Sequence, residues 1–121
     1  MYVETDFLLA LVKDDDWLGE RAETLYEEHE DDLWTSPHTL VELLLVAYRE
    51  GLNAERVVAN AKALIEVDGD AEPILAAASH VEDNGLTPFD ALHLVHAGDD
   101  AILSSDESYD EFADRVPLEP E

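Results

Sequence analysis

The stretch Ser36-Pro-His-Thr-Leu-Val-Glu-Leu-Leu-Leu-Val-Ala-Tyr-Arg-Glu-Gly51 decides the fold of this chain. Ser36 is a favourable N-cap residue, and the proline that follows suits the first helical position because no N–H is needed there. Glycine is a typical residue for ending a helix. Residues 40–48 are apolar almost all round. The pattern therefore predicts a central helix that runs from this cap to Gly51 and stops there.

Short apolar segments and helical patterns alternate on both sides of the central helix. Strands are expected at residues 1–5, 33–35, 101–103 and 116–118, and further helices at residues 6–12, 16–30, 53–67, 72–83, 89–97 and 107–114. Strands interleaved with helices favour an α/β layer fold with a mainly parallel sheet. The length of 121 residues is sufficient for one domain and too short for two.

The charge balance is strongly acidic, with 31 Asp and Glu residues against 6 Lys and Arg and a formal net charge of −25. Concentrated salt relieves such self-repulsion, since the Debye length falls to roughly 3 Å at 1 M. We therefore expect an extremely halophilic source. The absence of cysteine excludes disulfides, thiolate catalysis and Cys-based zinc sites. No apolar run approaches the roughly 20 residues of a membrane span, and no signal peptide is recognisable, so a cytoplasmic location is expected.

Four acidic residues stand in apolar or helix-starting contexts, unlike the many on solvated faces: Asp6, Glu42, Asp90 and Asp106. Glu42 is the only charge in its apolar run. An unpaired buried carboxylate costs several kcal/mol, so Glu42 needs a cation, a hydrogen-bond partner or exposure in a cleft. The acids recur near strand-to-helix turns, on what is expected to be one rim of one sheet. Carboxylates that converge there would repel one another unless Mg²⁺ or Mn²⁺ neutralised them.

Each of these acids also has a purely structural interpretation. Asp6 and Asp106 would be N-caps of the helices that follow them. Asp90 completes a Thr-x-x-Asp pattern close to a capping box. Glu42 would be a capping-box acid as well, although Ser36-Pro37 is the better helix start. The five histidines show no metal-binding spacing and receive no role.

Four motifs together resemble the PIN-domain family. Residues 4–9, Glu-Thr-Asp-Phe-Leu-Leu, resemble its Asp-Thr-Asn-Val-Leu-Leu opening, and residues 36–42 resemble its Ser-x-x-Thr-x-x-Glu helix. Residues 86–93 resemble the segment with its third acid, and residues 102–109 its Thr-x-Asp-x-x-Phe ending. The motifs occur in order over nearly the whole chain. The chain has Glu4 where the family usually has Asp, Asp6 where it has Asn or Ser, and Ser104 where it has Thr.

The resemblance implies a three-layer α/β/α PIN-like domain over residues 1–121, with a short, mainly parallel sheet flanked by helices. It implies a ribonuclease in which Asp6, Glu42, Asp90 and Asp106 bind one or two Mg²⁺ or Mn²⁺ ions that activate a water molecule. Asp6 is favoured as the first ligand over Glu4, which is a candidate second ligand. Family members of this length are commonly VapC-type toxins, which are homodimeric, cut RNA and are inhibited by a small antitoxin protein.

The acidity of the chain is the main objection to an RNA substrate, because RNA binding normally uses a positive surface. Phosphate contacts would depend on metal ions, histidines and a few cations, among which Arg49 and Arg56 flank the central helix and the next one. A phosphoacceptor receiver domain is a poor alternative because it needs a late lysine, and the last one here is Lys62. A stronger alternative is a PIN-like scaffold subunit that has lost catalysis, for which Glu4 is the clue.

Overall fold

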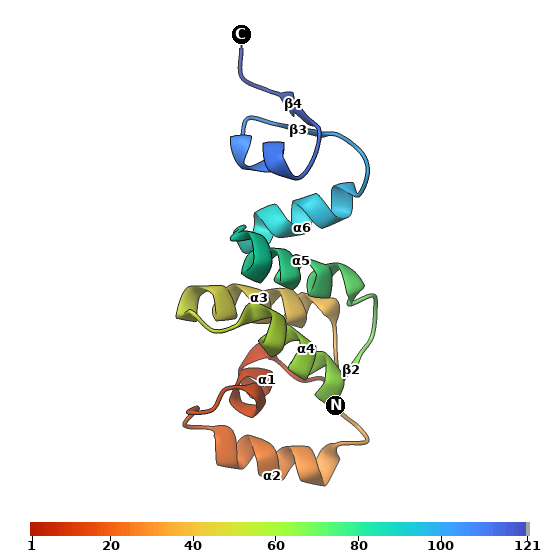
Figure 1. Ribbon diagram of the computed structural model, residues 1–121. Helices are drawn as coiled ribbons and strands as arrows, with labels where there is room; N and C mark the ends of the chain where they lie inside the picture. Colours follow the sequence, from red (N-terminus) through yellow and green to blue (C-terminus); the bar gives the residue numbers. More distant parts are fainter. Residues whose placement is uncertain (121) are drawn as a thin grey trace.

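The computed structural model describes residues 1–120 as a stack of helices with short strands (Figure 1). Helix α2 lies at one end, followed by α1, the central α3 and α4, then α5 and α6, and the pair β3 and β4 lies at the other end. The helices are α1 (Thr5–Val12), α2 (Gly19–His29), α3 (Pro37–Glu50), α4 (Ala54–Leu64), α5 (Glu72–Asn84) and α6 (Pro88–Ala97). The strands are β1 (Trp34–Thr35), β2 (Glu66–Val67), β3 (Ile102–Ser104) and β4 (Arg115–Pro117), and η1 (Glu107–Glu111) is a 3-10 helix.

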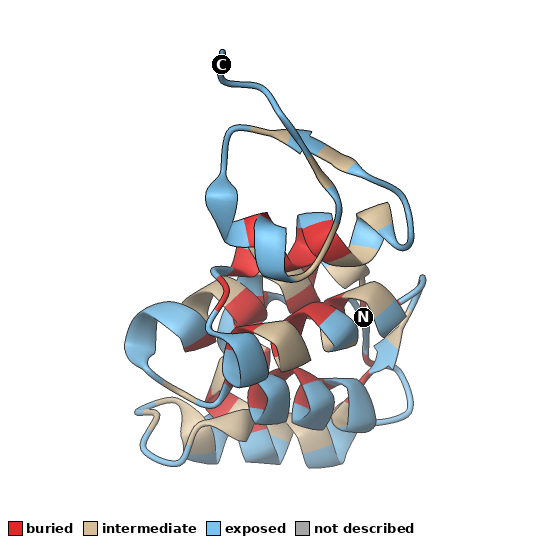
Figure 2. Ribbon diagram, turned by 45° about the horizontal axis from the view of Figure 1, so that its top comes forward, coloured by how far each residue is buried: buried red, intermediate tan, exposed pale blue. Residues whose placement is uncertain are grey.

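The central helix α3 confirms the sequence prediction at both ends. Ser36 is its N-cap in an extended conformation, and Gly51 ends it in the left-handed region with φ 71°. Leu40, Leu43 and Leu44 are fully buried, and α3 packs against α1, α4, α5 and α6. Figure 2 shows the buried residues gathered along the middle of the stack. The burial of this helix follows directly from its nearly continuous apolar surface.

The strand pairs are all parallel, which confirms the predicted α/β class with short parallel strands. Strand β1 pairs with β2, and Tyr2 adds a single parallel bridge to Trp34. Strand β3 pairs with β4. The two pairs do not join into one sheet within residues 1–120, because α5 and α6 lie between them in the stack (Figure 1). The single sheet expected from the sequence is therefore divided into two parts.

Several elements differ from the predictions. The strand predicted for residues 1–5 is only the bridge at Tyr2, because α1 already begins at Thr5. The helix predicted for residues 53–67 ends at Leu64, since Glu66 and Val67 instead form β2 beside β1. The helix predicted for residues 16–30 begins only at Gly19, because the Asp16 carboxylate accepts a hydrogen bond from the Leu18 N–H and forms a turn. The segment predicted as a helix over residues 107–114 is the short η1. None of the helices in residues 1–120 combines the length and apolar character that a membrane span requires.

Candidate functional site

Glu42 lies on the exposed side of α3 within a small polar group. Its Oε1 atom accepts a hydrogen bond of 3.2 Å from the Thr5 hydroxyl, at the start of α1. His38 Nε2, one turn earlier on α3, lies 3.4 Å from the same oxygen. The Glu42 side chain is 48% exposed. The charge of this carboxylate is therefore stabilised by solvent and by a hydrogen-bond partner, two of the three possibilities that its apolar sequence context left open. It does not cap α3, which begins after Ser36.

Glu4 and Asp6 stand on either side of Thr5 and point to different surroundings. Glu4 is the N-cap residue of α1, so the expectation that Asp6 caps this helix is wrong. Asp6 lines a hollow of about 190 Å³ between α1 and α2, together with Arg21. Glu4 borders a second hollow of about 290 Å³ that also contains Tyr2 and His29. The residue of this motif that reaches Glu42 is therefore Thr5, not either of the acids.

Asp90 is held by the hydroxyl group of Tyr109. The Tyr109 hydroxyl donates a hydrogen bond of 3.3 Å to Asp90 Oδ1. Thr87 is the N-cap of α6 but makes no side-chain cap hydrogen bond, so the capping box that would give Asp90 a structural role is not formed. Burial raises the pKa of Tyr109 to about 12, and the charge of Asp90 and the hydrogen bond to it act in the same direction. Tyr109 is therefore a neutral donor at physiological pH.

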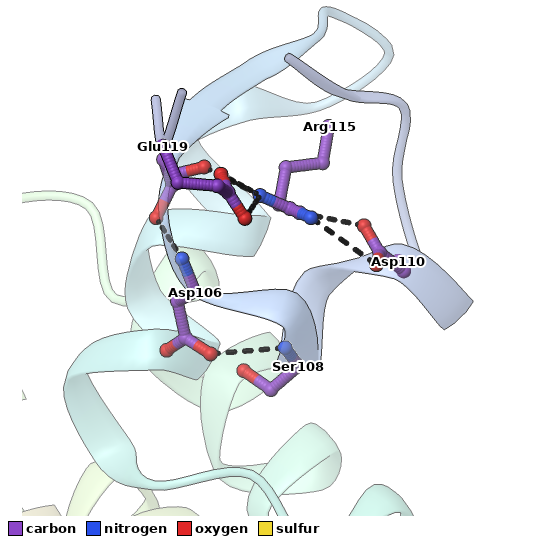
Figure 3. Close-up of polar contacts among 6 residues, drawn as sticks. Asp106, Ser108, Asp110, Arg115 and Glu119 are labelled. Carbon is purple, nitrogen blue, oxygen red and sulfur yellow. Dashed lines mark hydrogen bonds and ion pairs between the residues drawn. The ribbon is translucent and has the colours of Figure 1, made fainter. Parts of the chain in front are cut away.

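Asp106 is the N-cap of η1, as one of its two sequence interpretations predicts. Its Oδ1 atom accepts a hydrogen bond of 2.9 Å from the Ser108 N–H, and its own N–H donates to the Ser104 hydroxyl (Figure 3). The hydrogen bonds from Ser108 hold the pKa of this carboxyl below its ordinary value, and the positive charge of Arg115 acts in the same direction. This cap fixes the carboxylate next to the end of β3.

Arg115 forms hydrogen bonds that connect several parts of the C-terminal segment that contains Asp106. Its guanidinium donates to Asp110 Oδ1 at 2.6 Å, to Glu119 Oε1 at 2.9 Å and to the Ser104 carbonyl at 2.8 Å (Figure 3). These hydrogen bonds to Asp110 and Glu119 raise the pKa of Arg115 above its ordinary value. The side chain is only 7% exposed. Arg115 therefore has a structural role and is not available for phosphate groups.

The donor chemistry of these acids fits a hard divalent cation. Carboxylate oxygens are the ligands that Mg²⁺ and Mn²⁺ prefer. In residues 1–120 the second oxygen of Glu42 and the second oxygen of Asp90 accept no hydrogen bond. The arrangement, however, brings no three acidic or histidine side chains of the described chain together as a metal site. Glu42 contacts Thr5 and His38, Asp90 contacts Tyr109, and Asp106 caps η1. The strand pairs that contain β1 and β3 are separate as well.

Three residues near the acids were not singled out from the sequence: Thr5, His38 and Tyr109. The spacing of His38 and Glu42, four residues apart on one helix, was a usable signal for that contact. Thr5 and Tyr109 gave no such signal, because their partners lie 37 and 19 residues away in the chain. Tyr109 also borders a hollow of about 480 Å³ between α6 and β3, which His93, His96 and Ser104 line as well and which none of the candidate acids lines.

The basic residues of the chain are partly neutralised. Lys13 pairs with Glu50 at 2.9 Å, and Arg115 pairs with acids of its own segment. Within residues 1–120, Arg21, Arg49 and Arg56 form no ion pair. Arg56 borders a hollow of about 390 Å³ with Lys13, two asparagines and two aspartates. This hollow therefore contains as many cations as carboxylates.

The model of one protein family, the PIN domain, matches residues 1–115 of the chain. The match spans all five acidic residues considered as metal ligands, from Glu4 to Asp106. No curated protein and no solved structure matches the chain.

Proposed function

The chain belongs to the PIN-domain family, whose members are in general metal-dependent nucleases, and we propose that it is a Mg²⁺- or Mn²⁺-dependent endoribonuclease. The observation that carries this proposal is the family match over residues 1–115, which takes in every acid that the sequence marks as unusual. The absence of a capping role for Asp90 adds support, because the main structural interpretation of that residue fails.

The proposed ligands are Asp6, Glu42, Asp90 and Asp106, with Glu4 as the further candidate. A bound divalent cation would supply activation of a water molecule and neutralisation of charge on the phosphodiester. Glu42 and Asp90 each keep one oxygen without a hydrogen bond in the described chain, as a ligand requires. Asp6 lines the same hollow as Arg21, and its neighbour Glu4 borders another hollow. Variants at Asp6 and Glu4 therefore decide which of the two residues is the first ligand.

An RNA substrate has to approach a surface with a net charge of −25. Arg56 borders the hollow at the C-terminal end of α1, where Lys13 is paired with Glu50, and the asparagines there add neutral hydrogen-bond donors. Concentrated salt screens the remaining repulsion, since exposed charges farther apart than a Debye length of roughly 3 Å interact weakly at 1 M. We therefore propose that RNA binds in this hollow by local contacts in a salt-rich cytoplasm.

Within this function the proposed biological role is that of a VapC-type toxin. Such a toxin would act as a homodimer and would be inhibited by an antitoxin protein. The family match supports this role. Purification of the chain together with the product of a neighbouring gene would test it, and a monomer that binds no such product would contradict it.

The alternative is a PIN-like scaffold subunit without catalysis. Two observations favour it: Glu4 replaces the usual aspartate, and no three acidic or histidine residues of the described chain form a metal cluster. Such a scaffold would bind RNA or a partner protein without cleaving RNA. Binding of Mn²⁺ distinguishes the two functions, because a scaffold has no need of a metal.

The test is cleavage of a mixed RNA pool in molar KCl with Mn²⁺, compared between the native protein and Asp90→Asn. We expect Mn²⁺-dependent cleavage that the variant loses by at least about 100-fold, because the neutral amide is a much weaker ligand than a carboxylate. The control is Asp83→Asn, which changes an exposed acid of α5 in the same way. Absence of both cleavage and calorimetric Mn²⁺ binding by the native protein would overturn the proposal.

A further inference from the structure

Tyr2 and Trp34 form an aromatic pair on the surface, beside the start of α3. Their ring centroids lie 5.0 Å apart in an edge-to-face arrangement, and the two residues are 47% and 39% exposed. The Tyr2 hydroxyl is hydrogen-bonded to the Ser36 hydroxyl at 2.8 Å and to the Thr39 hydroxyl at 3.0 Å. A tyrosine usually packs its apolar ring and keeps its hydroxyl in water. Here the hydroxyl is bonded within the protein, so the aromatic pair is held in place while part of its apolar surface faces solvent.

The two sides of the aromatic pair differ in charge. On the Tyr2 side lies the hollow of about 290 Å³ in which Glu4 and His29 are the ionisable groups besides the tyrosine, among apolar side chains. On the Trp34 side lies another hollow of about 290 Å³, which four carboxylates line: Asp31, Asp32, Glu66 and Asp68. Like charges repel, so a polyanion meets less repulsion on the Tyr2 side.

The aromatic pair is also close to the polar group around Glu42. Thr39, which is bonded to the Tyr2 hydroxyl, lies three residues before Glu42 on α3. Residues three apart on a helix are neighbours on one face. A group that stacks on Tyr2 is therefore about one helical turn from the half-exposed Glu42 carboxylate.

We propose that the aromatic pair and the hollow on its Tyr2 side bind an unpaired nucleobase of single-stranded RNA. This inference rests on the proposed function, because it takes RNA as the substrate. Phosphate contacts weaken steeply as salt rises, and the chain has only 6 Lys and Arg residues to make them. Stacking on an aromatic ring needs no positive charge and suits every base, since each base has a π-face. The volume of the hollow is just below the roughly 300–1,000 Å³ of sites for drug-sized ligands, which suits one flat base.

The nucleobase contact is compatible with the phosphate contacts proposed at the other end of α1. Glu4, at the N-terminal end of α1, borders the hollow for the base, and Arg56 borders the hollow at the C-terminal end. With 8 residues, α1 is about 12 Å long. A single strand of a few nucleotides spans this length.

The experiment measures binding of a labelled single-stranded RNA of about ten nucleotides by fluorescence anisotropy. Molar KCl with EDTA is used, so that neither a metal nor cleavage contributes. We expect the Kd to rise at least about fivefold in Tyr2→Leu, the loss of one stacked base, and to stay within about twofold in Tyr48→Leu. Tyr48 is a matched control because it is 45% exposed and lies near the other end of α3. Tyr2→Phe keeps the ring and should bind within about threefold of the native protein.

A probe of the same length with abasic sites separates stacking from contacts to the sugar and phosphate. It should bind the native protein and Tyr2→Leu equally, because the variant removes only a contact to a base. A second measurement leaves the aromatic pair unchanged. In Trp17→Phe, Trp34 is the only remaining tryptophan, and its fluorescence should change when RNA binds but not when the abasic probe binds.

A native Kd in Tyr2→Leu would overturn the inference and leave the hollow to an apolar segment of a partner protein. An equal loss of affinity for the abasic probe, or unchanged Trp34 fluorescence at saturating RNA, would overturn it as well. The absence of RNA binding in EDTA would have the same consequence. The proposed function is decided separately by Mn²⁺-dependent cleavage, since Tyr2-dependent binding without cleavage would keep the nucleobase site and remove the nuclease.

Discussion

The contact between Tyr109 and Asp90 makes stability depend on pH at the scale of single residues. A free tyrosine loses its proton near pH 10, whereas burial and the neighbouring carboxylate raise the pKa of Tyr109 to about 12. The unfolded chain therefore releases this proton first as pH rises. The contribution of the neutral hydroxyl is complete below about pH 10 and is lost as pH rises through about 12.

The resulting prediction concerns the difference in free energy of unfolding between the native protein and Tyr109→Phe. This difference should shift in favour of the variant between about pH 10 and 12, because phenylalanine has no proton to lose. Urea unfolding at constant KCl concentration measures it at each pH. A difference that stays constant across this range would show that Tyr109 titrates normally in the folded protein.

The acids Glu42, Asp90 and Asp106 could be selected from the sequence because each stands in an unusual context. Their partners could not be selected in the same way. The Tyr109 to Asp90 hydrogen bond joins α6 to η1, and local spacing contains no information on such a contact. The choice between Glu4 and Asp6 had the same difficulty, since the start of α1 at Thr5 turns neighbouring side chains to different faces.

At the scale of elements, α3 carries the largest share of the buried side chains. Leu43 is fully buried near the middle of this helix, so Leu43→Ala should lower the free energy of unfolding by about 2–5 kcal/mol. Chemical denaturation in molar KCl measures this loss. Leu118→Ala is the control at an exposed position, with an expected change within about 0.5 kcal/mol. Similar losses in both variants would contradict the central position of α3.

The end of α3 depends on a single conformation. Gly51 has φ 71°, and a Cβ atom there would meet no atom within 4 Å. Gly51→Ala should therefore destabilise the protein by about 1 kcal/mol through backbone conformation alone. Thermal unfolding measures the loss, and an unchanged midpoint would show that the left-handed cap does not contribute.

The helices were easier to predict from the sequence than the strands, for a physical reason. The ends of α3 have local signals, a cap with proline and a glycine, so its bounds were correct. Strand β2 has no local signal that separates it from the preceding helix, because its partner β1 lies about 30 residues earlier. The division of the strands into two pairs depends on the packing of α5 and α6, which single-residue patterns do not specify.

At the scale of the whole molecule, the net charge of −25 should make stability depend on salt. We expect the Tm to rise between 0.2 and 3 M KCl, because salt screens repulsion among exposed carboxylates. Glu23→Lys/Glu27→Lys on the exposed side of α2 changes the net charge from −25 to −21, since each substitution adds two positive units. This variant should need less salt for the same Tm. A native Tm that is independent of KCl would contradict this expectation.

The proposed ribonuclease activity can be tested most directly by the chemistry of its products. Hydrolysis by water with the 3′ oxygen as the leaving group yields 5′-phosphate and 3′-hydroxyl ends. Purified native protein should produce such ends from end-labelled RNA in molar KCl only when Mn²⁺ or Mg²⁺ is present, and Asp90→Asn should not. Products with cyclic phosphate ends, or cleavage that persists in EDTA and in the variant, would contradict the assignment of the chain as a metal-dependent nuclease.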